Sequence, residues 1–128
     1  MILGIGTDIV AVARLRAALD RRGERFARRI LNAGEWADYA AASDPARILA
    51  RRFAAKEAVA KALGTGFREG IGPGQIEVVH DVRGGPGVRL HDAAARCMAR
   101  QGGTHMLLSI SDERAYAVAY AVLWGAAD

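Results

Sequence analysis

Glu57 and Lys61 place a carboxylate and an ammonium group one helical turn apart, and this pair is where the sequence first indicates chemistry. On an ordinary solvated helix such a pair contributes only about 0.3 kcal/mol. Two features favour a larger role here. The neighbouring positions are nearly all alanine, which lets a backbone or a ligand approach closely, and Arg52 and Lys56 interrupt the apolar stripe of the same segment. Cations in that stripe need a partner, because an unpaired buried charge is costly.

Asp8 is a second carboxylate of interest, because it follows a glycine-rich strand pattern. Residues 2–10 alternate as a strand does, with Gly4, Gly6 and Asp8 on one face. Glycine inside a strand marks close approach of another backbone or of a ligand, so Asp8 lies beside cleared space. Alternatively Asp8 caps the helix that follows, and the sequence leaves both roles open.

If Asp8 and Glu57 converge, two carboxylates on rigid elements form a site for a hard cation. Magnesium binds in this way and completes its octahedron with water and substrate phosphates. Arg52, Lys56 and Lys61 would then pair with phosphate oxygens. The pattern favours a magnesium-dependent enzyme with a phosphate-bearing substrate, but spacing alone does not bring Asp8 to Glu57.

The helix that carries Glu57 and Lys61 has clear start and stop signals. Asp44 is an N-cap acceptor before Pro45 at the first helical position, and Gly64 marks the end. This predicts about five turns. The apolar side of the helix holds Ile48, Leu49, Val59 and Leu63.

Short helices are expected between the strand and this long helix. Residues 12–22 are amphipathic and end at Gly23, and residues 24–31 add a turn or two. Asn32 and Glu35 have capping-box spacing, which gives Glu35 a structural explanation. The next helix should run to about residue 42, with Trp36, Tyr39 and Ala40 on its buried side.

The rest of the chain is expected to be a glycine-rich loop, residues 64–74, followed mainly by strands. One hairpin joins residues 75–82 to 87–90, a helix capped by Asp92 spans 93–101, and a second hairpin joins 106–111 to 115–124. The last strand has an alanine face that suits a closely packed helix. Its other face is a candidate self-association surface, formed by Tyr116, Val118, Tyr120, Val122 and Trp124.

These elements predict an α+β fold, with an antiparallel sheet packed against one long helix and several short ones. At 128 residues the chain should form a single domain, residues 1–128. No signal pattern or membrane-length apolar run is evident, so a cytoplasmic protein without membrane contact is expected. The lone Cys97 suits a reducing compartment, and His80, His91 and His105 lack the spacing of a zinc site.

The net charge of +4 is concentrated near the N-terminus. Such a face is most often solvated surface, but its density makes an acidic partner plausible. The seven arginines of this stretch are Arg14, Arg16, Arg21, Arg22, Arg25, Arg28 and Arg29.

Three stretches resemble the bacterial holo-acyl-carrier-protein synthases, which are 4′-phosphopantetheinyl transferases. They are Gly-Ile-Gly-Thr-Asp-Ile-Val at residues 4–10, the helix at residues 52–66 and Ser-Ile-Ser-Asp-Glu-Arg-Ala-Tyr-Ala at residues 109–117. The similarity runs nearly end to end at about the family's length. It implies transfer of the phosphopantetheine arm of coenzyme A to a serine of apo-acyl carrier protein, with release of adenosine 3′,5′-bisphosphate, in support of fatty acid biosynthesis.

The resemblance also implies roles for particular residues. Metal ligands fall on Asp8 and Glu57, which with Lys61 form the catalytic set, and Lys61 matches a lysine that contacts the diphosphate of coenzyme A. Residues matching positions near coenzyme A are Arg52, Lys56, Lys61, Gly64 and Thr65. Carrier-protein contacts carry over to Arg14, Arg21, Arg25, Phe26 and Arg29. Members of the family assemble as homotrimers with shared active sites.

The chain departs from the family at two positions, and two other functions also fit its residues. Many relatives have histidines where this chain has Leu107 and Asp112, so no histidine role carries over, and the Asp-Glu-Arg version resembles the proteobacterial form. A basic nucleic-acid-binding domain is the main alternative, but it needs aromatic residues among the cations, and residues 14–29 offer only Phe26, so no nucleic-acid partner is expected. The second alternative is another magnesium-dependent phosphoryl enzyme that uses Asp8 and Glu57.

Overall fold

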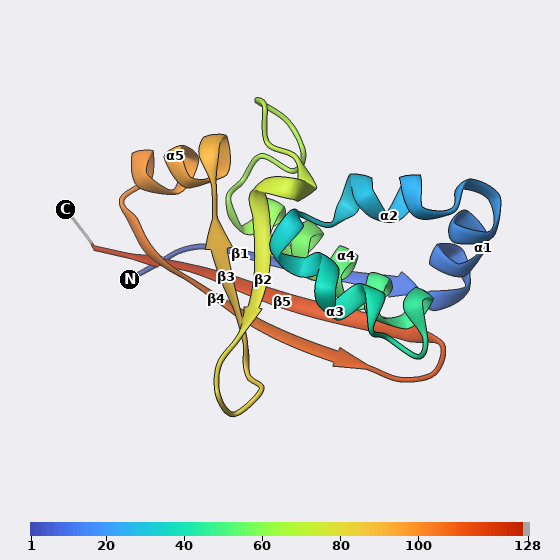
Figure 1. The fold of residues 1–128 in the computed structure, drawn as a ribbon. Helices are drawn as coiled ribbons and strands as arrows, with labels where there is room; N and C mark the ends of the chain where they lie inside the picture. The colour runs from blue at the N-terminus through green and yellow to red at the C-terminus, as the bar shows by residue number, and fades with distance from the viewer. Residues whose placement is uncertain (127–128) are drawn as a thin grey trace.

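The structure is a computed structural model that describes residues 1–126. It has the predicted α+β fold, with antiparallel strands around a long central helix (Figure 1). The strands are β1 (Ile2–Ala11), β2 (Ile76–His80), β3 (Pro86–Leu90), β4 (Gly103–Asp112) and β5 (Tyr116–Gly125). The helices are α1 (Val12–Arg22), α2 (Glu24–Ile30), α3 (Trp36–Ala40), α4 (Pro45–Ala62) and α5 (Asp92–Arg100), with 3₁₀ turns η1 (Ala33–Glu35) and η2 (Pro73–Gln75).

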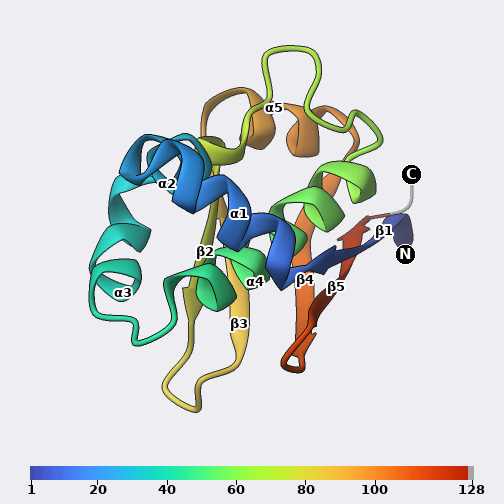
Figure 2. The same ribbon diagram turned by 90° about the vertical axis from the view of Figure 1, so that its right-hand side faces the viewer.

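The helix α4 lies across one face of a three-stranded sheet with the order β1-β5-β4 (Figures 1 and 2). The alanines of β5, Ala117, Ala119 and Ala121, are buried on that face, as the sequence predicts. Gly4 and Gly6 of β1 are glycines because α4 leaves no room there. A Cβ added at either position would collide with the backbone carbonyl of Ala62 or Ala58. The predicted close approach is therefore that of the helix backbone itself.

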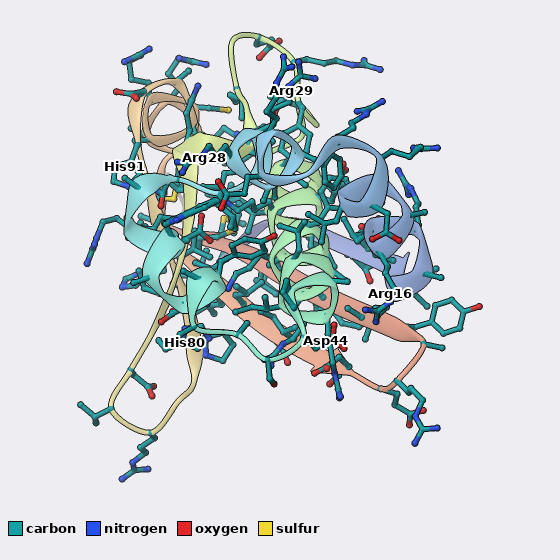
Figure 3. The ribbon with its side chains drawn as sticks, turned by 45° about the vertical axis from the view of Figure 1, so that its right-hand side comes forward. Arg16, Arg28, Arg29, Asp44, His80 and His91 are labelled. Carbon is teal, nitrogen blue, oxygen red and sulfur yellow. The ribbon has the colours of Figure 1, made fainter. Side chains whose placement is uncertain are left out.

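The ends of α4 follow the sequence signals. The side chain of Asp44 accepts a hydrogen bond from the Arg47 amide, Pro45 is the first helical residue, and Gly64 has a φ of 86° just beyond the end. The Asp44 cap also pairs with Arg16 of α1 at 3.2 Å, so α1 is tied to the start of α4 (Figure 3).

No helix covers the other face of the three-stranded sheet (Figures 1 and 2), and this face carries large apolar side chains. Ile5 is 70% exposed and Tyr120 is 60% exposed. The remaining exposed apolar residues of these strands are Ile2, Ile9, Leu107, Tyr116 and Trp124. The sequence assigned the large residues of β5 to one face correctly.

The short elements differ from the predictions in two places. The helix α3 ends at Ala40 rather than near residue 42, and Ala40 is exposed while Trp36 and Tyr39 are only partly buried. The predicted Asp92 cap is wrong, because Asp92 lies inside α5 with a φ of 52° and makes no capping bond. Instead Oε1 of Gln75 accepts from the Ala94 amide at 3.0 Å, a partner too distant in sequence for a capping pattern to reveal.

Candidate functional site

Asp8, Glu57 and Lys61 lie together where α4 crosses β1. Nζ of Lys61 is 3.3 Å from Oδ1 of Asp8 and donates to the carbonyl of Thr7 at 2.9 Å. Asp8 makes no capping bond to α1, whose N-cap is Ala11. Of the two roles that the sequence left open for Asp8, the structure thus favours the one in which it faces α4.

The charge of Asp8 also reaches Glu57. Burial raises the pKa of Glu57, and the nearby carboxylate of Asp8 raises it further, against the opposing effects of Lys61 and Arg14. A carboxyl group whose ionised form is disfavoured by burial and by a neighbouring carboxylate is the arrangement that a bound cation relieves. The structure therefore brings together the residues that spacing alone could not join.

The donor set at this site fits magnesium better than a structural metal. Within residues 1–126 no group of three or more histidine, cysteine, aspartate or glutamate side chains could enclose an ion. Two carboxylates leave most of an octahedron to water and to phosphate oxygens, which is how Mg²⁺ is held in enzymes that act on phosphates. Asp8 and Glu57 are the side chains that would bind the ion.

Arg52 and Lys56 occupy a different face of α4, where they surround a buried glutamate. Nζ of Lys56 donates to Oε1 of Glu35 at 2.6 Å and to the carbonyl of Pro73 at 2.9 Å. Arg52 donates to Oε2 of Glu35 at 3.3 Å and to Asp38 at 3.2 Å. These are the partners that the sequence required for cations inside the apolar stripe. The predicted contacts of both residues with coenzyme A stay predictions.

Gly64 and Thr65 directly follow the end of α4, one turn beyond Lys61. The amides of Thr65 and Gly66 both donate to the carbonyl of Ala60, which closes the helix and leaves Gly64 with open space around it. The predicted contact of Gly64 and Thr65 with coenzyme A stays a prediction.

The predicted carrier-protein residues gather over α1 and α2. Arg21, Arg25, Phe26 and Arg29 line a hollow of about 430 Å³, together with Arg22. A second hollow of about 250 Å³ adds Arg14 and Phe53, and the guanidinium of Arg14 stacks on the Phe53 ring at 5.8 Å. Figure 3 shows Arg29 on this helical side of the molecule. The structure thus forms one basic surface, next to the Glu57 face of α4, from residues that the sequence shows only as a run.

Arg22 and Asp112 were not predicted as site residues from the sequence, where Arg22 appeared only in the run of seven arginines. Arg22 lines both hollows and stacks on Phe26 at 6.0 Å. Asp112 accepts from Arg47 at 2.6 Å and lies 3.5 Å from Arg51. Its arginine partners are more than sixty residues away in sequence, so no local pattern could identify them.

Known proteins resemble this chain over nearly its whole length. The family model of the 4′-phosphopantetheinyl transferase superfamily matches residues 4–121. A holo-acyl-carrier-protein synthase of Halorhodospira halophila is 57% identical over 123 residues, 96% of this chain and 98% of the relative.

Among solved structures, the holo-acyl-carrier-protein synthase of Neisseria meningitidis superposes with a TM-score of 0.91 at 40% identity, covering 97% of this chain and 99% of the other. The synthase of Bacillus anthracis, solved in complex with coenzyme A (3′,5′-ADP), gives a TM-score of 0.81 at 35% identity and covers 98% and 99%. In residues 1–126 no helix combines the length and the apolar character needed to cross a membrane.

Proposed function

The chain belongs to the 4′-phosphopantetheinyl transferase superfamily and is a holo-acyl-carrier-protein synthase, and from this premise we propose that it is magnesium-dependent and works through Asp8, Glu57 and Lys61. The reaction transfers the phosphopantetheine arm of coenzyme A to a serine of apo-acyl carrier protein and releases adenosine 3′,5′-bisphosphate. The observation that carries the proposal is the meeting of two carboxylates and one ammonium group at the crossing of α4 and β1.

Each of these residues has a role that follows from its position. Asp8 and Glu57 would hold the magnesium ion, and a bound ion would supply positive charge against the diphosphate and lower the pKa of bound water. Lys61 lies half-exposed beside Asp8, so its ammonium group can turn to the diphosphate and stabilise the leaving phosphate. Gly64 and Thr65 extend the coenzyme A contact beyond the helix end. Catalysis of this kind depends mainly on positioning and on charge.

The basic surface over α1 and α2 is the proposed docking site for the acyl carrier protein. Its arginines and Phe26 offer positive charge around an aromatic ring, which suits an acidic helix that also presents apolar side chains. The surface borders the same side of α4 as Glu57, since Arg14 is near enough to oppose the rise in the pKa of that carboxyl group. A docked carrier protein would therefore place its serine close to the metal ligands.

We also propose a homotrimer in which the outer face of β1, β5 and β4 is covered by neighbouring subunits, with active sites shared between them. The exposed apolar residues of that face, such as Ile5 and Tyr120, support an interface.

We propose that the enzyme works in the reducing cytoplasm, which the single buried thiol of Cys97 suits.

The deciding experiment incubates the protein with coenzyme A, Mg²⁺ and apo-acyl carrier protein, and measures the mass of the carrier. Addition of the phosphopantetheine mass is expected, and its absence where a known synthase works would refute the proposal.

An Asp8→Asn variant should lose at least about 100-fold in rate, because one carboxylate cannot hold the ion in place. Full activity of this variant, or of the wild type in excess EDTA, would refute the metal assignment.

A further inference from the structure

Lys56 lies at the centre of a buried ionic cluster directly beside the metal-ligand position. Its side chain is 0% exposed, and that of its partner Glu35 is likewise buried. The carboxylate of Glu35 also accepts from the amides of Asn32 at 3.0 Å and Val78 at 3.3 Å. With Lys56 and Arg52 it therefore has four donors, which use the full accepting capacity of a carboxylate.

The cluster connects elements that together surround α4. Glu35 belongs to η1, Val78 lies on β2, and the carbonyl of Pro73, which accepts from Lys56, begins η2. Pro73 also lies at the far end of the glycine-rich loop, residues 64–74, whose first residues are Gly64 and Thr65. The single ammonium group thus holds α4, the turn before α3 and the end of this loop.

Position on the helix links the cluster to the site. Arg52 and Lys56 are one turn apart and share one row of α4, while Glu57 and Lys61 form the next row, about 100° further round. A rotation of α4 that moves the first row from Glu35 must also move the second row from Asp8. Backbone contact at Gly4 and Gly6 fixes the distance from α4 to β1, but contacts of this kind tolerate sliding and rotation better than directional ion pairs do.

The choice of amino acid is a further indication. The chain has 18 lysine and arginine residues, of which only Lys56 and Lys61 are lysines. An arginine binds phosphate at least as well as a lysine, so contact with coenzyme A phosphates alone would not require lysine at position 56. The fully enclosed site between Glu35 and the Pro73 carbonyl requires lysine at this position, because a planar guanidinium is larger than an ammonium group.

We propose that Lys56 and Glu35 are positioning residues of the Asp8, Glu57 and Lys61 site. Their buried ion pair sets the rotation of α4 about its axis and anchors the end of the glycine-rich loop, and Lys56 does not contact coenzyme A. The inference rests on the proposed function for the roles of Asp8, Glu57 and Lys61. It differs from the expectation that Lys56 matches a position near coenzyme A.

A double-mutant cycle tests the proposal with Lys56→Met, Glu35→Gln and the combined variant. The combined variant is the key protein, because it removes one positive and one negative charge together and leaves Arg52 paired with Asp38. If Lys56 acts through Glu35, the two losses in kcat/KM are not additive, and the combined variant stays within about threefold of Lys56→Met. We expect kcat to fall about 10- to 100-fold, the KM for coenzyme A to change less than about twofold, and Mn²⁺ binding to Asp8 and Glu57 to weaken.

Other results would overturn the proposal. A Lys56→Met variant with a raised KM for coenzyme A and an unchanged kcat would mean that Lys56 contacts the substrate. A combined variant that keeps wild-type kcat and Mn²⁺ affinity would mean that the pair does not position the site, whatever its melting temperature. Failure of the proposed function itself is distinguishable, since Asp8→Asn would then bind Mn²⁺ as the wild type does, whatever happens at Lys56.

The wild-type protein provides a test that does not depend on the folding of variants. Reductive methylation with ¹³C-formaldehyde labels amines, and this chain has only the N-terminus, Lys56 and Lys61. Lys61, which is half-exposed, should be labelled quickly and be protected by coenzyme A with Mg²⁺, whereas Lys56 should stay unlabelled with or without ligand. Rapid labelling of Lys56 that coenzyme A then blocks would overturn the inference.

Discussion

Replacing Gly6 with alanine gives the sharpest test of how this site is held together. A Cβ at this position would lie 2.8 Å from the Ala62 amide nitrogen and 2.9 Å from Cβ of Lys61, and closer still to the carbonyl of Ala58. These are mostly backbone atoms of α4, so no side-chain rotation can make room. Ordinary contact begins near 3.4 Å, and relief of the closest contact, with the Ala58 carbonyl, moves the helix from β1 by on the order of an ångström or more.

The expected cost follows from that displacement. Overpacking against a rigid backbone destabilises by about 2 kcal/mol, which for a chain of this length lowers the melting temperature by roughly 6–10 °C. Activity should fall by more than the loss of stability explains, on the order of 100-fold at a temperature where the variant is fully folded, because Glu57 and Lys61 move away from Asp8 together.

The assay is the mass of the acyl carrier protein after reaction, measured beside a thermal unfolding curve. Gly74→Ala is the matched control, since a Cβ there meets nothing within 4 Å, and it should behave as the wild type. If Gly6→Ala melts within about 1 °C of the wild type and transfers at the same rate, the close contact of α4 and β1 does not determine the site geometry.

Three other outcomes are expected. The pKa of Glu57 is higher in the folded than in the unfolded chain, so the metal-free protein loses stability as pH rises through that raised pKa. Bound Mg²⁺ removes the repulsion between the carboxylates, so it should raise the melting temperature more at about pH 8 than at about pH 5. An equal rise at both pH values would contradict the metal assignment. Arg25→Ala should raise the KM for the carrier protein roughly three- to tenfold at low salt and much less at high salt. The control variant Arg83→Ala, on the β2–β3 loop, should leave this KM unchanged at both salt concentrations. An equal change in KM for the two variants would argue against docking over α1 and α2. Tyr120→Glu, on the open face of β5, should convert trimers into monomers in analytical ultracentrifugation. The control variant Val82→Glu, on the β2–β3 loop, should leave the trimer intact. If the mass is unchanged for both variants, the sheet face is not the interface.

Local signals in the sequence predicted the elements well. The Asp44 and Pro45 start of α4, the end of α1 before Gly23, and the Asn32 and Glu35 capping box all appear as expected, because each depends on residues within a few positions of one another. The alternation in β5 predicted both of its faces for the same reason.

What the sequence could not supply were the partners across long separations. Glu35 had a sufficient local explanation as a capping residue, yet its carboxylate also binds Arg52 and Lys56, 17 and 21 residues away. Capping accounts for one of the hydrogen bonds that this carboxylate accepts and gives no sign of the others. The Asp8 and Glu57 pair was similarly open until a resemblance to known synthases suggested it, because no periodicity relates a strand at the N-terminus to a helix in the middle of the chain.

The seam of alanine and glycine between α4 and the sheet has a consequence for how the site responds to heat. Alanine and glycine have no side-chain rotamers, so nothing in this seam can repopulate as temperature rises. The separation of the α4 and β1 backbones is then a property of main-chain packing, and it should stay constant until the whole helix leaves the sheet. Activity against temperature should accordingly rise smoothly and end abruptly at cooperative unfolding, and the amides of β1 and α4 should be among the last to exchange their hydrogens with solvent.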